Sequence, residues 1–322
     1  MPRTAFIFGA GCSLGTLGPA SPASKDFGKR LDTAHPGAFP ALDKVANHLG
    51  RPLGALSLEQ LWTCVDYHAK FEKMLPEPFD WREGSRDLKR ALIRVYGTDC
   101  NNAAEKLAGK TKFTLWKILK QIRPGDTLVS FNYDTIIEGL ASRLGYDLRS
   151  FDYELRDDVI NLAKPHGSIS WCLDLRTGTV TSSHLDGSPL LKMIAEHEVA
   201  EFREPLVLGA VPIKSELLLG EQKSHGCGEV FDVVARQWRG VIEAVRTAER
   251  LVVVGYGFPV EDDYGRFLFT EAARLRSEPV AIDCYETKDG WKKTKPSIEG
   301  VFAGKLAKLK RVDKVKPPHP WF

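Results

Sequence analysis

The 322-residue sequence lacks several features that mark whole classes of protein. Its six cysteines are far apart and never form the paired C-x-x-C spacing of a structural zinc site, so no zinc ribbon is expected. No run approaches the ~20 apolar residues that span a bilayer. The first residues also lack the basic stretch, apolar region and cleavage site of a signal peptide. We therefore expect reduced thiols in a cytoplasmic protein that has no membrane segment.

The sequence also has little excess charge. Its 45 basic and 42 acidic residues leave a formal net charge of +3, which is too small to predict attraction to nucleic acid or to an anionic membrane. Lysines crowd only in the segment Trp291–Lys316. This segment is interpreted either as a solvated face or as a docking face for an acidic partner.

Short apolar runs that alternate with helical patterns indicate the fold class. The runs are typical of buried strands, and they cover Thr4–Phe8, Thr127–Phe131, Val159–Ala163, Pro205–Val211, Leu251–Val254 and Val280–Cys284. Helical patterns cover Lys112–Ile122, Thr135–Leu144, Val230–Ala248 and Glu261–Leu275. Buried strands that alternate with helices predict an α/β protein with a doubly wound parallel sheet.

The stretch between the first two predicted strands has a helical pattern. Residues 42–101 read as several helices separated by proline and glycine breaks, and one helix start is clear because Ser57 and Gln60 form a capping-box pattern. We interpret residues 35–123 as a helical insertion between the first and second core strands, acting as a lid or a packing subdomain. It would belong to a single domain that spans residues 1–322.

Four clusters of glycine or polar residues follow predicted core strands, and open α/β sheets bind ligands at the carboxyl ends of their strands. The first cluster is Gly9-Ala10-Gly11-Cys12-Ser13. Its glycines would let the backbone approach a pyrophosphate, and the next helix would offer amide donors. Leu14 stands where a full G-x-G-x-x-G pattern has its third glycine, so an ordinary tight turn explains the cluster equally well.

The second and third clusters contain the candidate catalytic side chains. The second is Ser130-Phe131-Asn132-Tyr133-Asp134, and the third is Lys164-Pro165-His166-Gly167-Ser168. Asn132 or Asp134 could simply cap the helix that follows. A lone histidine is more often structural, but His166 stands between proline and glycine with no apolar face to bury it. This setting favours acid/base or hydrogen-bonding work.

The fourth cluster is Gly255-Tyr256-Gly257-Phe258, followed by three acidic residues that open the next helix, Glu261, Asp262 and Asp263. We interpret these acidic residues as complements of the helix dipole rather than as metal ligands. The Gly-x-Gly pattern offers a second close backbone approach, suited to the adenosine half of a dinucleotide. Asp283, which ends the next predicted strand, could bind a ribose hydroxyl or form a turn.

Taken in order, the motifs G-A-G-C-S, S-F-N-Y-D, K-P-H-G-S and G-Y-G-F resemble those of the sirtuin superfamily. The sequence is most similar to the superfamily's prokaryotic branch of NAD hydrolases from anti-phage defence systems. The stretch Leu208–Lys214 resembles that branch's proline-containing segment, and the likeness extends in short islands from Phe6 to about Tyr285. The resemblance implies a Rossmann-type sheet, NAD⁺ as the substrate and no metal.

The resemblance also implies roles for individual residues. Asn132 and His166 would act at the reaction centre, with Asp134 in support. The residues expected to hold NAD⁺ are Gly9, Ala10, Gly11, Cys12, Ser13, Gly167, Gly255, Tyr256, Gly257 and Asp283. Classical protein deacylases of the superfamily carry glutamine before that asparagine and a four-cysteine zinc module, whereas this chain has Phe131 and no such module. These departures favour hydrolysis of NAD⁺ to nicotinamide and ADP-ribose over deacylation.

An unregulated NAD⁺ hydrolase would poison its own cell, so we expect its activity to be gated. The chain has little room for a separate sensor domain, and the expected gates are a homo-oligomer or a second defence protein. The alternatives are a non-catalytic module that senses NAD or ADP-ribose, and a protein deacylase or ADP-ribosyltransferase. A dehydrogenase would leave the second and third clusters unexplained. The hydrolase hypothesis requires Asn132 and His166 to meet at one crevice.

Overall fold

The computed structural model describes residues 3–17, 26–71, 81–107, 114–150, 154–174, 180–182, 203–207, 227–260 and 262–312. The stretch Leu208–Lys214, Glu261, and Lys314 and Lys316 of the lysine-rich segment lie outside the described residues. Among the described residues, no helix is long and apolar enough to cross a membrane.

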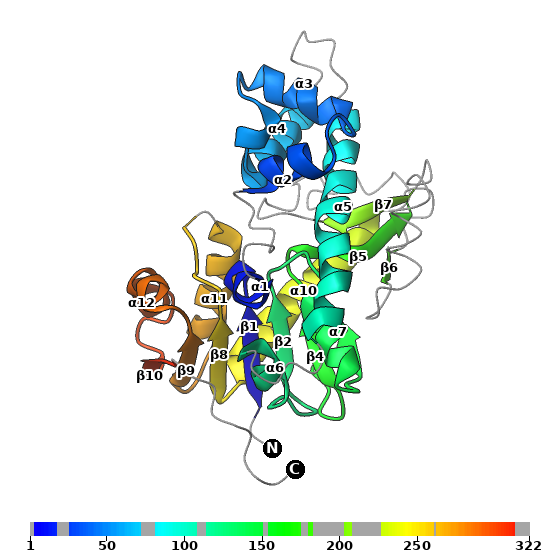
Figure 1. The fold of residues 1–322 in the computed structure, drawn as a ribbon. Helices are drawn as coiled ribbons and strands as arrows, with labels where there is room; N and C mark the ends of the chain where they lie inside the picture. The colour runs from blue at the N-terminus through cyan, green and yellow to red at the C-terminus, as the bar shows by residue number, and fades with distance from the viewer. Residues whose placement is uncertain are drawn as a thin grey trace.

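A seven-stranded sheet forms the centre of the molecule, and all of its neighbouring strands pair in parallel (Figure 1). The strands are β1 (Thr4–Phe8), β2 (Thr127–Ser130), β3 (Leu148–Ser150), β4 (Ile160–Ala163), β8 (Arg250–Val254), β9 (Val280–Tyr285) and β10 (Leu306–Arg311). Their spatial order is β10-β9-β8-β1-β2-β4-β3. β1 is therefore central, with β2, β3 and β4 on one side of it and the later strands β8, β9 and β10 on the other. This arrangement confirms the α/β class and the doubly wound, Rossmann-like sheet.

Helices cover both faces of this sheet. One face packs against α10 (Cys227–Thr247), α11 (Asp263–Arg274) and α12 (Lys288–Val301), and the other against α1 (Ala10–Leu17), α6 (Thr114–Leu119) and α7 (Ile136–Arg143). In β1, Ala5 and Ile7 belong to the first core, whereas Phe6 and Phe8 belong to the second. Successive side chains of a strand point to opposite faces, so a strand covered on both sides is apolar throughout.

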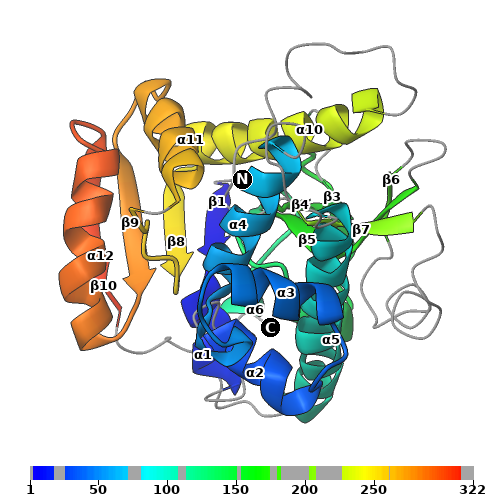
Figure 2. The same ribbon diagram turned by 90° about the horizontal axis from the view of Figure 1, so that it is seen from above.

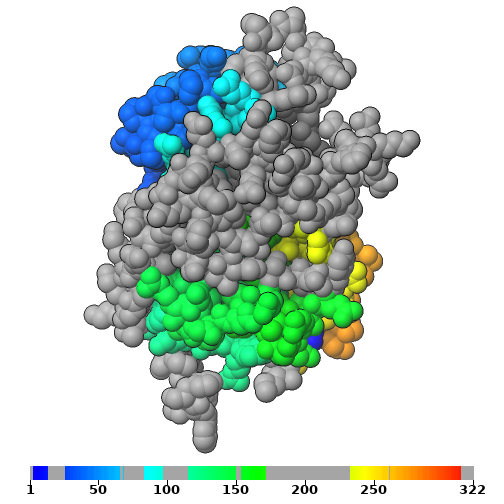
Figure 3. All heavy atoms as spheres, turned by 90° about the vertical axis from the view of Figure 1, so that its right-hand side faces the viewer, coloured from blue at the N-terminus to red at the C-terminus, as the bar shows by residue number. Residues whose placement is uncertain are grey.

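A second group of helices lies beyond the carboxyl ends of the strands, at the top of Figure 1 and nearest the viewer in Figure 2. It contains α2 (Phe27–Ala34), α3 (Pro40–His48), the short 3₁₀ helix η3 (Leu53–Ala55), α4 (Leu58–Phe71) and part of α5 (Trp81–Leu107). These helices share a core of their own. With 27 residues, α5 is about 40 Å long at 1.5 Å per residue, and it extends from this group to α7. Figure 3 shows the same division from the side, with α2–α4 in blue at one end.

The described elements between β1 and β2 are all helices, and one start follows the capping box read from the sequence. The Ser57 amide donates to Gln60 Oε1 at 3.0 Å, and the Gln60 amide donates to Ser57 Oγ at 3.2 Å. These reciprocal bonds satisfy amides that the first turn of a helix leaves unpaired. The division of the chain at residues 35 and 123 stays a prediction.

One segment differs from the sequence-based expectation. The predicted core strand Pro205–Val211 corresponds to β7 (Arg203–Val207), which pairs antiparallel with β5 (Gly167–Asp174) in a separate sheet that also contains β6 (Val180–Ser182). The lysine-rich segment contains most of α12 and the edge strand β10, and five of its lysines are exposed: Lys292, Lys293, Lys295, Lys308 and Lys310. Lysines on an edge strand discourage pairing with another chain.

Candidate functional site

The four sequence clusters follow four neighbouring strands of the main sheet. In spatial order these strands are β8, β1, β2 and β4, and they precede the fourth, first, second and third clusters respectively. Because parallel strands present their carboxyl ends at one edge, segments far apart in the chain meet there. The position between β1 and β8 is also the point where the strand order reverses, which is the usual ligand site of such sheets.

The glycines of the first and fourth clusters let the loops after β1 and β8 touch. Gly255 has a backbone φ of +62°, and a Cβ atom on it would lie 2.2 Å from the Cys12 amide nitrogen. A Cβ atom on Gly9 would lie 2.7 Å from the Gly255 carbonyl oxygen. By contrast, a Cβ atom on Gly257 would meet only Thr294 Oγ1, at 3.6 Å. Packing therefore requires glycine at 9 and 255 but not at 257.

The contact between the two loops uses two backbone amides of the predicted phosphate loop. The Gly9 amide donates to the Val254 carbonyl at 3.1 Å, and the Gly11 amide donates to the Gly255 carbonyl at 2.9 Å. Ala10 and Gly11 are exposed in the first turn of α1. The face that this loop offers to a ligand is therefore the first turn of α1, and pyrophosphate binding stays a prediction.

Asn132, Ser13 and Asp134 form a buried polar network that joins the ends of β1 and β2. Asn132 Nδ2 donates to the Gly9 carbonyl at 3.1 Å and to Ser13 Oγ at 3.0 Å. Ser13 Oγ donates to Asp134 Oδ2 at 2.7 Å, and Asp134 Oδ1 accepts from the Ile136 amide at 3.1 Å. Asp134 thus caps the start of α7, as one interpretation of the sequence proposed, whereas Asn132 binds the loop after β1.

Burial governs the ionisation of this part of the site. It raises the pKa of Asp134, although Lys164, Ser13 and the Ile136 amide act in the opposite direction. Burial also raises the pKa of Cys12 well above its ordinary value, and the charge of Asp134 adds to this effect. Cys12 is therefore a neutral thiol in the core rather than a nucleophile.

Lys164 links several segments of the fold through hydrogen bonds, a role that was not recognised from the sequence. Its side chain is fully buried, and Nζ donates to the Asp134 carbonyl and to Glu138 Oε1, each at 2.6 Å. Its backbone amide donates to Gln237 Oε1 at 2.9 Å. One buried ammonium group therefore joins the end of β4 to the second cluster and to α7.

His166 lies among aromatic side chains. Its ring meets the Phe131 ring edge-on at 5.0 Å between centroids, and lies nearly parallel to the Tyr133 ring at 6.2 Å. Only 12% of its side chain is exposed. The expectation that no apolar face would bury His166 is therefore wrong, because the second cluster supplies that face from the neighbouring strand.

Asp262 is the functional candidate that sequence reasoning missed. It was assigned to the start of α11, and its side chain does accept the Gly265 amide there at 2.9 Å. The same carboxylate lies 3.3 Å from His166 Nε2 and accepts the Tyr256 hydroxyl at 2.7 Å. The available signal was its position seven residues after Gly255, beyond the same strand end as the fourth cluster.

Asn132 and His166 stand at the ends of adjacent strands, but their side chains have different partners. Asn132 binds the loop after β1, whereas His166 contacts Asp262 beyond β8. Phe131, which precedes Asn132 in the chain, lies against the surroundings of His166. Its ring contacts His166 and stacks on Tyr256 at 4.3 Å between centroids.

Two other predicted NAD-binding residues have structural contacts. Asp283 lies inside β9, and its carboxylate forms ion pairs with Arg250 and Lys310. Gly167 begins β5 with a backbone φ of +79°, and its amide donates to the Lys164 carbonyl at 3.0 Å. The roles of both residues in binding stay predictions.

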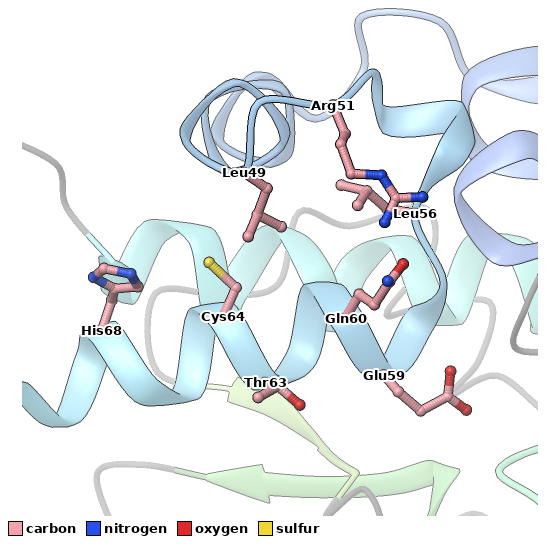
Figure 4. Close-up of a pocket in the computed structure, with 8 residues that line it drawn as sticks. All are labelled: Leu49, Arg51, Leu56, Glu59, Gln60, Thr63, Cys64 and His68. Atoms are coloured by element: carbon pink, nitrogen blue, oxygen red, sulfur yellow. The ribbon is translucent and has the colours of Figure 1, made fainter.

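A cavity of about 470 Å³ lies in the other group of helices (Figure 4). Its lining residues are Leu49, Arg51, Leu56, Glu59, Gln60, Thr63, Cys64 and His68. The volume would accommodate a small molecule. None of the predicted catalytic residues lines it, so this cavity is distinct from the site at the strand ends.

Within the described ranges, no group of three or more histidine, cysteine, aspartate or glutamate side chains is arranged to hold a metal ion. No family model matches the chain, and the comparison with curated proteins finds no match.

Proposed function

We propose that the chain is a sirtuin-like NAD⁺ glycohydrolase, which cleaves the bond between nicotinamide and ribose to give nicotinamide and ADP-ribose. One observation carries the proposal. Asn132, His166 and the glycine loop after β1 gather at the carboxyl ends of adjacent parallel strands, beside the point where the strand order reverses. That edge is the dinucleotide site of Rossmann-like sheets.

The chemistry suits polar side chains without a metal. Cleavage builds positive charge on the ribose while the leaving nicotinamide is neutral, so no acid has to protonate it, and the site needs geometry and polarity. Asn132 would position the ribose or a water molecule, and Asp134 would hold Asn132 in place through Ser13. His166 would accept a proton from a ribose hydroxyl or from the attacking water, a contribution of roughly 10²–10⁴ in rate.

The biological role follows from the same proposal. A cytoplasmic enzyme that depletes NAD⁺ would serve as an effector of anti-phage defence. Its activity would be gated by assembly of a homo-oligomer or by a second defence protein.

Nicotinamide release tests the proposal directly. Purified protein is incubated with NAD⁺, alone and with candidate activators, and N132A and H166A are compared with N47A and H48A, whose positions are exposed on α3. We expect the first two variants to lose turnover while circular dichroism stays unchanged, and the two controls to keep it. Equal turnover in all of these proteins would overturn the assignment of Asn132 and His166.

A second function is favoured by one specific observation. The Asn132 side-chain amide already donates to the Gly9 carbonyl and to Ser13 Oγ. In this arrangement its hydrogen bonds are made within the protein rather than to a ligand. This arrangement suits a module that senses NAD or ADP-ribose without catalysis. Calorimetric binding of NAD⁺ with no nicotinamide release under any condition would favour the sensor over the hydrolase.

A further inference from the structure

The carboxylate of Asp262 contacts three parts of the fold: the loop after β4, the loop after β8 and the first turn of α11. Oδ1 accepts the Gly265 amide at 2.9 Å and faces His166 Nε2 at 3.3 Å, while Oδ2 accepts the Tyr256 hydroxyl at 2.7 Å. The distance to His166 is at the long end for a hydrogen bond, as is common for catalytic pairs in the absence of substrate.

The protonation state of Asp262 determines which of the two residues, Asp262 or His166, carries the hydrogen between them. Burial acts to raise the pKa of Asp262, but the hydrogen bond and the charge of His166 outweigh it. Hydrogen bonds from Tyr256 and the Gly265 amide add to this effect, and together they hold the pKa of Asp262 below its ordinary value. Asp262 is therefore a carboxylate at neutral pH, and a carboxylate can only accept hydrogen bonds. His166 Nε2 must then carry a hydrogen to approach this oxygen, so in the neutral form of the ring the lone pair is on Nδ1.

Both partners are held in place by their surroundings. The loop that carries Asp262 contains Phe258, whose φ of +51° is unusual for a residue other than glycine. Its buried ring packs edge-on against Phe269 at 4.9 Å between centroids. The His166 ring is confined by Phe131 and Tyr133.

We propose that Asp262 is a positioning residue that fixes the tautomer of His166 and makes Nδ1 the atom that takes up a proton. The catalytic consequence rests on the proposed hydrolase function. The oxygen of the attacking water bonds to the ribose carbon as the bond to nicotinamide breaks. The water proton passes to Nδ1, and the resulting imidazolium keeps its Nε2 hydrogen directed at the Asp262 carboxylate until Nδ1 releases the proton to solvent.

The tautomer is measured without any substrate. The full chain is labelled with ¹⁵N-histidine, and H166A identifies the His166 signals among those of the eight histidines. In the neutral form of the ring we expect the shift of a protonated Nε2 and an unprotonated Nδ1. D262N should lose this preference, because asparagine can also donate to the ring, whereas the exposed neighbour variant D263N should keep it. A hydrogen on Nδ1 of the neutral ring in the wild-type protein, or an unchanged spectrum in D262N, would overturn the inference.

The kinetic comparison measures the consequence for turnover. D262N should lower kcat by about 10²–10⁴-fold with little change in KM, since a ring whose hydrogen is on Nδ1 cannot take up a proton there, while substrate contacts remain. D263N should match the wild type. Asparagine is as good a helix cap as aspartate, so D262N keeps the start of α11. If no protein releases nicotinamide, the proposed function fails, and the ¹⁵N spectra still decide the tautomer.

Discussion

Replacing Lys164 with methionine removes a cation from the protein interior. The side-chain exposures of Lys164 and Glu138 are 0% and 5%, and their charged atoms lie 2.6 Å apart. Glu138 Oε2 already has no hydrogen-bond partner among the described residues, so K164M would leave the whole carboxylate without a countercharge. Removing one member of a buried ion pair costs about 3–5 kcal/mol of unfolding free energy. For a chain of this length, this corresponds to a decrease in Tm of about 4–7 °C.

A double-mutant cycle isolates the contribution of the pair. Guanidinium unfolding is measured for the wild type, K164M, E138L and the double variant. We expect the double variant to lose much less stability than the sum of the single variants, because it contains neither buried charge. The exposed pair Lys292–Asp289, at 3.1 Å, provides the matched control, and K292M should change the free energy by less than about 1 kcal/mol.

Two results would refute this reasoning. Additive single variants would mean that the two charges do not interact, despite their short distance. A loss below about 1 kcal/mol in K164M would mean that Glu138 takes up a proton or finds water at little cost. The second result would also mean that the bond from Lys164 to the Asp134 carbonyl adds little to stability.

Three further predictions concern stability. G255A should lower Tm strongly or prevent folding, because its Cβ atom would meet the Cys12 amide at 2.2 Å in a left-handed conformation, whereas G257A should melt like the wild type. Asp262 has a lowered pKa, so its stabilisation is present above the unfolded-state pKa of about 4 and is lost as pH falls through the folded-state pKa. The stability difference between wild type and D262N should therefore shrink from pH 7 to pH 3, and a constant difference in denaturant titrations would contradict this. S57A should lose about 1 kcal/mol in thermal melts, and no loss would show that the capping box adds nothing.

The buried parallel strands could be predicted from the sequence because burial on both faces makes them uniformly apolar. Thr4–Phe8 was predicted with the same bounds as β1, and Leu251–Val254 differs from β8 by one residue. The positions of the four clusters followed from these strands, since each cluster begins where an apolar run ends.

Other elements depend on partners that local sequence patterns do not specify. The run that includes β7 has an apolar pattern like that of a core strand, but its partner is the antiparallel β5. The strand β10 is largely exposed at the sheet edge, and α12 contains Pro296, so neither has a strong local signal.

The contacts within the candidate site also depend on partners that local sequence patterns do not specify. The contact of His166 with Asp262 joins residues 96 positions apart. The aromatic rings that surround His166 come from the neighbouring strand's loop. Such contacts exist only after the sheet has assembled, so the sequence predicts which residues are near the strand ends but not their partners.

The central place of β1 has a consequence for synthesis of the chain. Phe8 pairs with Val254, so one edge of β1 stays open until β8 has been made. At roughly 5–20 residues per second, β8 leaves the ribosome about 12–50 s after β1. During translation, one edge of this short apolar strand therefore stays unpaired in a partly formed sheet, where it is accessible to chaperones and to aggregation.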